Sequence, residues 1–388
     1  MRVLQVVTLL SPDGAFGGPA RVSLNQSAEL LALGHDVTIA AACRGFPAGA
    51  TKLDGVPVQL FEIRTLVPNI GFPGSRSRRL TKWFRNHAAD YDIVHIHFGR
   101  DLVVLPVARL ARRKGIPYVL QTHGMVTPSS NPLATPLDIV WTRKILRAAR
   151  AVLALTDHER AQLEQVARTR LRLVDLPNGV PDYPAATPGP GPPEVLFVAR
   201  MHARKRPLVF AEMARVMLDD GIDARFALVG PDGGEGPALQ AAIDGDSRIS
   251  WQGALTPSDI PKRLANARVY VLPSVREPYP MALLEAMAVG VPVVVSADCG
   301  LASVVARTGC GVVVDARTGS GDDFGGQPSA FAAAVTAILS DPDLARTMGE
   351  RGRRTAHTEF GMRAIAERLA TIYAECAIPT ESDTRRLS

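Results

Sequence analysis

The sequence predicts an α/β protein made of two Rossmann-like domains, each built around a parallel sheet. Short apolar runs typical of buried strands alternate with helical patterns along the chain, which is the pattern of repeated βαβ units. A proline- and glycine-rich stretch, PDYPAATPGPGPP, interrupts this alternation at 181–193. With 388 residues, the chain is long enough for two domains that each bury a full core.

The first predicted domain spans residues 1–183. It opens with the strand MRVLQVVTLL, the glycine-bearing loop SPDGAFGGPA, the amphipathic helix RVSLNQSAELLALG and the strand HDVTIAAAC. Further strands are predicted at VPVQLFEI, DIVHIHF, PYVLQTH and AVLALT. Because helical stretches separate these strands, we expect them to pair in parallel.

After this domain we expect a Pro/Gly-rich linker at 184–193 and a second domain at 194–355. Strands of the second domain are predicted at EVLFVAR, RFALVG, ISWQG, VYVLPS, VPVVVSA and GCGVVV. The run AIAERLATIYAE predicts a closing helix within 356–378, and residues 379–388 are expected to form a disordered tail.

Two glutamates eight positions apart, Glu277 and Glu285, give the strongest functional signal. The prolines between them disfavour helix, whereas Met281 onward favours it, so Glu277 should lie on a loop and Glu285 two turns inside a helix. The apolar run VPVVV at 291–295 predicts a strand buried on both faces, so this loop falls where open α/β sheets bind ligands. A helix amino end suits a phosphate, and two acids can each hold sugar hydroxyls. A nucleotide-sugar site is the interpretation that we prefer to two solvated surface acids.

This segment, with LEAMAVGVPVV inside it, resembles the retaining glycosyltransferases of family 4, and the resemblance covers essentially the whole chain. That family has the GT-B fold, in which two Rossmann-like domains face each other across a cleft. The resemblance implies transfer of a sugar from a nucleoside-diphosphate sugar to an acceptor hydroxyl, in the synthesis of cell-surface polysaccharide or glycolipid. It also implies that the helix within 356–378 packs back on the first domain. Many members carry glycine at the place of Pro280, so the amides of Met281 and Ala282 would have to contact the phosphate here.

The resemblance implies roles for two acids and two cations. Glu277 would hold hydroxyls of the donor sugar, and Glu285 those of the nucleotide ribose. Arg200 and Lys205, in FVARMHARKRP after the first strand of the second domain, would hold the two phosphates without a metal ion. A solvated basic turn is the alternative for this pair. No metal site and no cofactor other than the donor substrate is expected.

Three further residues would face the substrates if the resemblance holds. Gly17 and Gly18 would let the backbone lean over the donor diphosphate, with a plain turn as the alternative. Leu255 would present backbone groups to the nucleotide base, a contact that needs no particular side chain. The identity of the base therefore cannot be read from the sequence.

One histidine, His123 in QTHGM, is expected beside the donor sugar and the reacting centre, since it follows a predicted strand and its context matches the family. His95 and His97 alternate along another strand, and we expect them to face opposite sides. A packing role is the safer interpretation for both.

Charge is distributed unevenly. Residues 1–183 hold 23 Lys and Arg against 14 Asp and Glu, a net of +9, leaving 21 against 24 for the remainder. A basic first half predicts an acidic partner for that half, but no nucleic-acid motif is present and aromatic residues are few. The run RSRRLTKWFR at 76–85 is typical of an interfacial helix as much as of an ordinary surface helix. We therefore expect no nucleic acid, and keep peripheral membrane contact through the first domain as a hypothesis.

Neither a membrane span nor a secretory signal is evident, so a soluble, cytoplasmic protein is expected, with peripheral association at the inner face of the membrane kept open. Its four cysteines are widely separated and contain no C-x-x-C, which argues against a zinc site and a disulfide framework. The acceptor, a sugar or a lipid-linked glycan, cannot be read. A nucleotide-sugar epimerase or hydrolase, or a non-catalytic nucleotide-sugar-binding subunit, are the alternative functions.

Overall fold

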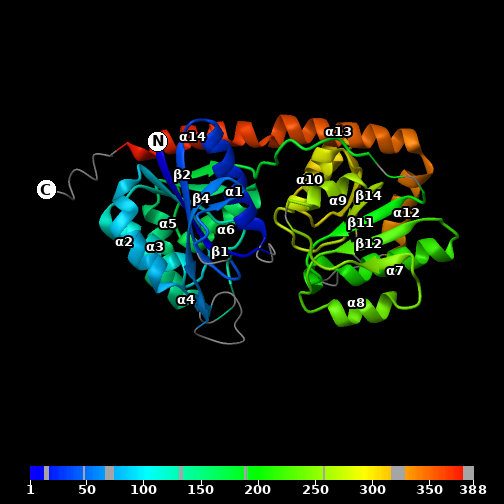
Figure 1. The fold of residues 1–388 in the computed structure, drawn as a ribbon, viewed down its shortest axis with the longest axis horizontal. Helices are drawn as coiled ribbons and strands as arrows, with labels where there is room; N and C mark the ends of the chain where they lie inside the picture. Colours follow the sequence, from blue (N-terminus) through cyan, green and yellow to red (C-terminus); the bar gives the residue numbers. More distant parts are fainter. Residues whose placement is uncertain are drawn as a thin grey trace. The chain divides into compact units, whose positions relative to one another are not determined.

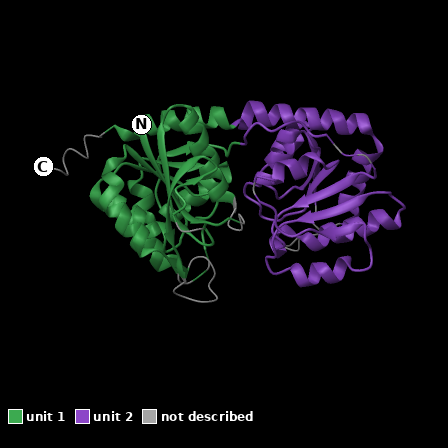
Figure 2. Cartoon of the chain, viewed as in Figure 1, with its two compact units in different colours: residues 1–179, 362–388 green, residues 180–361 purple. Residues whose placement is uncertain are grey.

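The computed structural model describes residues 1–12, 17–46, 49–65, 74–129, 131, 134–187, 189, 191–256, 258–315 and 328–378. The chain forms two compact units (Figure 2), one of Met1–Gly179 with Met362–Ser388 and the other of Val180–Gly361. The first unit is therefore discontinuous in sequence. The expected tail at 379–388 lies outside the described residues.

The division between the units falls at Gly179, four residues before the boundary that we expected. The proline-rich stretch belongs to the second unit, and the amide of Ala186 donates to the carbonyl of Val289 at 2.6 Å. The long helix α13 (Pro342–Phe360) also belongs to the second unit, so the chain returns to the first unit only at Met362.

Unit 1 contains an eight-stranded sheet with the order β10-β9-β8-β7-β1-β2-β4-β3. Its strands are β1 (Arg2–Leu10), β2 (Asp36–Cys43), β3 (Lys52–Leu53), β4 (Val56–Glu62), β7 (Ile93–His97), β8 (Tyr118–Gln121), β9 (Ala151–Ala154) and β10 (Leu173–Asp175). All neighbours pair in parallel except β3 with β4. A separate two-stranded ribbon joins β5 (Arg64–Thr65) and β6 (Ser75–Arg76). The parallel sheet predicted from the alternating pattern is confirmed.

Helices cover both faces of this sheet (Figure 1). The helices of unit 1 are α1 (Gly17–Ala32), α2 (Arg78–His87), α3 (Val104–Lys114), α4 (Ala134–Leu137), α5 (Arg143–Ala148), α6 (Asp157–Ala167) and α14 (Met362–Ala377), with a short 3-10 helix η2 (Ala88–Asp90) and a π-helical segment η3 (Asp138–Thr142). One core lies under α2, α3, α5 and α6. The other joins α1 and α14 to the opposite face, where Leu369 and Tyr373 pack with Val3 and Leu30.

Unit 2 contains a six-stranded, wholly parallel sheet with the order β13-β12-β11-β14-β15-β16. Its strands are β11 (Glu194–Val198), β12 (Arg225–Val229), β13 (Ile249–Trp251), β14 (Val269–Leu272), β15 (Val293–Ser296) and β16 (Gly311–Val314). Every residue of β14 and β15 is buried, as the apolar runs predicted. This is the Rossmann order 3-2-1-4-5-6, so strand order reverses between β11 and β14.

The helices of unit 2 connect these strands (Figure 1). They are α7 (Pro207–Asp219), α8 (Gly236–Ile243), α9 (Ile260–Ala265), α10 (Met281–Val289), α11 (Ala302–Thr308), α12 (Pro328–Ser340) and α13, with a 3-10 turn η4 (Ala203–Lys205). In α10 every residue from Leu283 to Val289 is buried.

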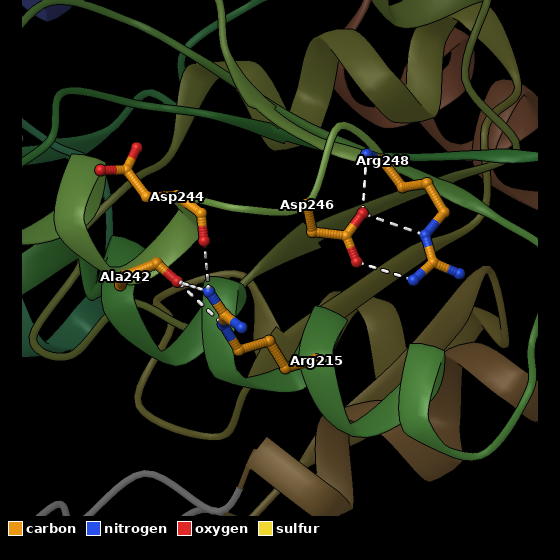
Figure 3. A network of polar contacts seen from close by, with 5 residues as sticks. All are labelled: Arg215, Ala242, Asp244, Asp246 and Arg248. Atoms are coloured by element: carbon orange, nitrogen blue, oxygen red, sulfur yellow. Dashed lines mark hydrogen bonds and ion pairs between the residues drawn. The ribbon is translucent and has the colours of Figure 1, made fainter.

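A polar network fixes the turn between α8 and β13 (Figure 3). Arg215 of α7 donates from Nε to the carbonyl of Ala242 at 2.8 Å and from Nη2 to that of Asp244 at 3.3 Å. Arg248 donates to both carboxylate oxygens of Asp246, at 3.0 and 2.7 Å, which holds the pKa of that carboxyl down at about 2. These contacts stabilise the amino end of β13. The candidate site lies at the opposite, carboxyl ends of the strands.

Among the described residues, no helix is both long enough and apolar enough to span a bilayer.

Candidate functional site

Two of the predicted site residues of unit 2, Lys205 and Glu277, meet where the strand order reverses. Arg200 and Lys205 follow β11, and Glu277 follows β14, which is hydrogen-bonded to β11. Because connections leave these two strands in opposite directions, the loops at their carboxyl ends diverge and leave room for a ligand. The geometry of the sheet therefore brings residues 72 positions apart in sequence to the same place.

Lys205 and Glu277 form an ion pair between Nζ and Oε2. The side chain of Glu277 is 7 % exposed and that of Lys205 19 %, so this pair is largely shielded from water. A buried ion pair is retained only when its geometry is good and its charges have further partners. The pair thus fixes one cation and one anion at the carboxyl ends of β11 and β14.

The backbone around Glu277 is held from two sides. The amide of Val275 donates to the carbonyl of Arg204 at 2.9 Å, which ties the loop after β14 to the loop after β11. The amide of Gly300 donates to the carbonyl of Glu277 at 2.8 Å. A Cβ at Gly300 would overlap the carbonyl oxygen of Pro278, so only glycine allows this close approach.

Helix α10 begins directly behind this loop, with Pro280 as its N-cap residue and no side-chain hydrogen bond to close its first turn. The amides of Met281 and Ala282 belong to that first turn, where N–H groups lack intrahelical partners, and both residues are partly exposed. The helix amino end can therefore receive an anion. Glu285 is buried, but it is the fifth helical residue, little more than one turn inside and not the two turns that we expected.

The glycine loop after β12 packs on Arg200. A Cβ at Gly233 would lie 2.7 Å from both Cγ and Cδ of Arg200, so glycine makes room for the aliphatic part of this arginine. The amide of Gly233 donates to the carbonyl of Met201 at 2.9 Å. Asp232 Oδ1 accepts from the amides of Gly234 and Gly236, at 2.8 and 2.9 Å, which closes the loop on itself. The loop therefore packs against the aliphatic part of Arg200, while the residue as a whole stays exposed.

Leu255 lies in the loop after β13, at the same carboxyl edge of the sheet but two strands from β11. The neighbouring loops are tied together, because the amide of Gly230 donates to the carbonyl of Gly253 at 2.7 Å and Trp251 Nε1 donates to the carbonyl of Gly230 at 2.9 Å. Leu255 is partly exposed beside them. Its backbone remains a candidate for contact with a base.

In unit 1, Gly17 and Gly18 are the first residues of α1, and residues 13–16 of the preceding loop lie outside the described part. A Cβ at Gly18 would meet no atom within 4 Å. Crowding by the protein itself therefore does not explain a glycine at this position.

Three histidines of unit 1 form a stack. The rings of His95 and His97 lie with centroids 4.5 Å apart, and those of His97 and His123 with centroids 5.0 Å apart and planes 4° from parallel. Our expectation that His95 and His97 face opposite sides was wrong, because residues two apart on a strand share a face. His95 and His97 are fully buried on the side of the sheet that α14 covers, where Tyr373 contacts His95 Nδ1 at 2.6 Å, and His123 is partly exposed.

Hydrogen bonds assign the protons of this stack. Gln5 Oε1 accepts from His97 Nε2 at 2.9 Å, so His97 Nδ1 is left to accept from His123 Nε2 at 2.8 Å. Burial lowers the pKa of His95 and of His123 to about 3, and that of His97 well below its usual value. All three imidazoles are therefore neutral near pH 7, and His123 cannot serve as a cation for a phosphate.

Glu159 of α6 holds the turn that carries His123, a role that sequence reasoning missed. His123 has φ of 51°, a left-handed conformation that costs energy for a non-glycine residue. On either side of it, the Thr122 hydroxyl and the Gly124 amide donate to Glu159 Oε1, the second at 2.6 Å. Glu159 Oε2 accepts from the amide of Leu155 at 2.7 Å. The buried carboxylate therefore clamps both flanks of His123.

A local signal for Glu159 was present. Thr156-x-x-Glu159 has the spacing of a capping box, and the Thr156 side chain does accept from the amide of Glu159 at 3.2 Å. What the spacing could not show is that the carboxylate reaches past its own helix to the loop after β8. Within the described residues, no group of three or more His, Cys, Asp and Glu is placed to hold a metal ion.

Comparison with known proteins agrees with this geometry. Residues 184–355 match the family model of the glycosyl transferases group 1, and residues 17–179 match that of a glycosyl transferase 4-like domain. The alpha-maltose-1-phosphate synthase of Mycolicibacterium smegmatis is 30% identical over 325 residues, 74% of this chain and 80% of the relative. The UDP-Gal:alpha-D-GlcNAc-diphosphoundecaprenol alpha-1,3-galactosyltransferase of Escherichia coli is 28% identical over 313 residues, 76% of this chain and 78% of the relative.

The fold itself matches a solved structure. Sucrose-phosphate synthase from Thermosynechococcus elongatus superimposes with a TM-score of 0.74 at 20% identity, covering 96% of this chain and 98% of that one. The expected GT-B fold of two parallel-sheet α/β domains is thereby confirmed.

Proposed function

The chain belongs to the glycosyl transferases group 1 family and is a glycosyltransferase of the nucleotide-sugar-dependent type, and we propose that it transfers one sugar to an acceptor hydroxyl with retention of anomeric configuration. The donor is a nucleoside-diphosphate sugar, and the acceptor belongs to the synthesis of a cell-surface polysaccharide or glycolipid. The reaction is proposed to need no metal ion.

One observation carries this proposal: Lys205 and Glu277 are paired at the reversal of strand order, directly before the open amino end of α10. A diphosphate needs positive charge and N–H donors, whereas a sugar needs carboxylates that accept from its hydroxyls. The loops after β11 and β14 supply both within one set of contacts. A site for an uncharged metabolite would have no use for this arrangement.

The phosphates are the part of the donor on which charge develops as the sugar leaves. Lys205 and Arg200 supply charge-assisted hydrogen bonds, and the amides of Met281 and Ala282 supply a helix amino end. Groups that stabilise the departing diphosphate more strongly than the bound donor accelerate the reaction. Glu285 is assigned to the ribose hydroxyls, since it is buried on the same helix behind these amides.

Retention by attack from the face that the diphosphate leaves is favoured over a covalent intermediate. In this step the bond from the anomeric carbon to the phosphate oxygen breaks, and the acceptor oxygen bonds to that carbon on the same face. The acceptor proton passes to the departing phosphate oxygen. Glu277 is already ion-paired with Lys205, which makes its carboxylate a weak nucleophile and suits it to hold donor hydroxyls.

His123 is proposed to lie beside the donor sugar as an uncharged wall. Its pKa of about 3 excludes a cationic role near neutral pH. Gly17 and Gly18 are proposed to let the amino end of α1 approach the diphosphate, and Leu255 to meet the nucleotide base through its backbone.

The acceptor is proposed to be a lipid-linked glycan. Support comes from the Escherichia coli relative, whose name specifies UDP-Gal as donor and a diphosphoundecaprenol-linked sugar as acceptor. The Mycolicibacterium relative is named as a synthase of a sugar phosphate, so a soluble acceptor is the contrasting outcome.

A thermal-shift screen against UDP-, GDP- and ADP-sugars tests the donor site, because a ligand that binds only the native state raises the melting temperature. One class of nucleotide sugar should raise it, and none of them doing so would contradict the proposal. Product analysis with and without acceptor then separates transfer from hydrolysis or epimerisation, which consume or convert the donor alone. The anomeric proton coupling of the product, measured by NMR, reports retention or inversion.

A further inference from the structure

Three packed segments of unit 1 present an outer surface that is rich in cations. Helices α2, α3 and α5 cover the same core and contact one another in turn (Figure 1). Residues 78–87, 104–114 and 134–148, which contain these helices, hold eleven Lys and Arg but one acid. The whole chain has a net charge of only +6. We call the outer surface of these three segments the cationic face.

The single acid of the three segments does not reduce this charge. Asp138 is buried and accepts two hydrogen bonds from Arg100, at 2.8 and 2.9 Å, so it points into the protein. On the outer surface, Lys82, Arg113 and Lys144 are all exposed. Exposed cations gathered on one surface create a positive potential that attracts an anionic partner.

An apolar turn stands within the cationic face. Ile139 and Val140, in η3, are 51% and 53% exposed and are two of the four large hydrophobic residues of the described chain that are exposed. Trp141 follows them, half-buried, with the guanidinium carbon of Arg109 5.6 Å from its ring centroid. Tryptophan beside cations and exposed aliphatic residues is typical of a protein surface at the interface of a bilayer.

We infer that the cationic face docks on a bilayer that contains anionic phospholipids, with Ile139 and Val140 entering the headgroup region. Lys and Arg on α2 and α3 then lie against the lipid phosphates. A nucleic acid or acidic polysaccharide would match the charge, but neither has a use for two exposed aliphatic side chains beside a tryptophan. The inference goes beyond the proposed transfer reaction, although such docking would bring a lipid-linked acceptor to the enzyme.

Vesicle co-sedimentation of the full chain tests the charges. Vesicles of equal parts phosphatidylcholine and phosphatidylglycerol should bind the protein, and pure phosphatidylcholine vesicles should bind it far less. Each cation near an anionic surface changes the binding constant about fivefold, so Lys82→Ser with Arg113→Ser should weaken binding more than tenfold. The matched control, Lys262→Ser with Arg354→Ser in unit 2, removes the same net charge from exposed positions and should bind as the wild type.

The apolar turn is tested separately. Ile139→Ser with Val140→Ser should weaken binding to the anionic vesicles at high salt, where screening leaves mainly the apolar contribution. Ile378→Ser, at a more exposed aliphatic position elsewhere in unit 1, should have no effect. In the wild type, Trp141 fluorescence should shift to shorter wavelength on addition of anionic vesicles, and Trp141→Phe should remove most of that shift.

Equal loss of binding in the unit 2 control would overturn the inference, since it would reduce the effect to net charge. Binding to RNA or to an acidic polysaccharide with no binding to anionic vesicles would overturn it as well and would assign the face to another polyanion. Donor hydrolysis measured without acceptor or lipid should be unchanged in all of these variants. Vesicle binding can therefore be observed even if the protein does not catalyse the proposed transfer, and transfer can be observed even if vesicle binding fails.

Discussion

Lys205 and Glu277, 72 residues apart in sequence, share an ion pair that bridges the loops after β11 and β14. The pair spans the place where strand order reverses, which is where open α/β sheets generally bind ligands. Each residue can be exchanged for a side chain of similar size and different charge, which makes the pair the most direct point at which to test the proposed chemistry.

Removing the cation of this pair should depress turnover. Lys205→Ala is expected to lower kcat by about 10²–10³-fold, the usual cost of losing one preorganised group that stabilises departing charge. Lys205→Arg should recover part of the rate, because it keeps the charge. Steady-state kinetics with the identified donor provides the measurement, and wild-type kcat in the alanine variant would show that the phosphates are held elsewhere.

Glu285 should determine nucleotide affinity more than chemistry. Its replacement by alanine is expected to weaken binding of the free nucleoside diphosphate by about tenfold to a hundredfold, since a hydrogen bond to a charged group contributes about 1.5–3 kcal/mol. Isothermal titration calorimetry measures this directly. Unchanged affinity in Glu285→Ala would remove the ribose role.

The clamp at Glu159 should be a large contributor to local stability. Glu159→Ala leaves the Thr122 hydroxyl and the amides of Gly124 and Leu155 without their acceptor, and each unsatisfied buried group costs about 1–3 kcal/mol. We expect a loss of at least about 3 kcal/mol in the free energy of unfolding. Glu159→Gln keeps an acceptor oxygen and should lose less. Urea titration of the two variants makes the comparison, and equal stability of Glu159→Ala and the wild type would refute the clamp.

Acid should destabilise the fold through the histidine stack. In the folded chain the pKa of His95 and of His123 is about 3 and that of His97 is also lowered, whereas in the unfolded chain each is near 6.5. The unfolded state therefore binds protons first, so stability is complete above about pH 6.5 and is lost as pH falls toward 3. Burial raises the pKa of Asp101 to about 6, which opposes this trend between that value and its ordinary 3.8.

With three histidines acting against one aspartate, the free energy of unfolding should fall as pH is lowered from about 6 to 4. Urea midpoints at a series of pH values measure the slope. The variant His123→Gln should make this slope shallower, because one group fewer binds a proton on unfolding. A slope unaffected by this substitution would mean that His123 is not buried as a neutral ring.

Chelation should leave the reaction intact. Arg200, Lys205 and the amides of α10 are proposed to neutralise the diphosphate, so dialysis against EDTA is expected to change kcat by less than about twofold, within the error of a mutant comparison. Recovery of a lost activity by added Mg²⁺ or Mn²⁺ would contradict the proposal. Lys205→Ala assayed with added Mg²⁺ is the informative control, because a divalent ion could then replace the missing charge.

Most strands and helices could be predicted from the sequence, because buried parallel strands such as β14 and β15 appear as uninterrupted apolar runs. The order of the strands within each sheet could not be predicted from such local patterns. Glu277 and Lys205 were each identified from their own loops, yet their contact depends on β11 and β14 being neighbours, which only the folded sheet decides. Long-range pairing of this kind lies outside local sequence patterns.

The contacts around His123 show the same limit more clearly. The histidine was found from its position after a strand, but the groups around it come from three other elements: His97 of β7 bonds to its ring, Gln5 bonds to His97, and Glu159 bonds to the residues on either side of it. Glu159 lies 36 residues later on α6, and Gln5 lies at the start of the chain on β1. The capping-box spacing before Glu159 indicated a helix start, and nothing local could distinguish that role from a clamp on a distant turn.

The return of α14 to unit 1 imposes an order on biosynthesis. Leu369 and Tyr373 complete the core beside Val3 and Leu30, so the part of this face that α14 covers stays open while residues 180–361 are being translated. A nascent chain stalled before Met362 would therefore expose the apolar surface of its first sheet that Leu369 and Tyr373 cover in the complete fold.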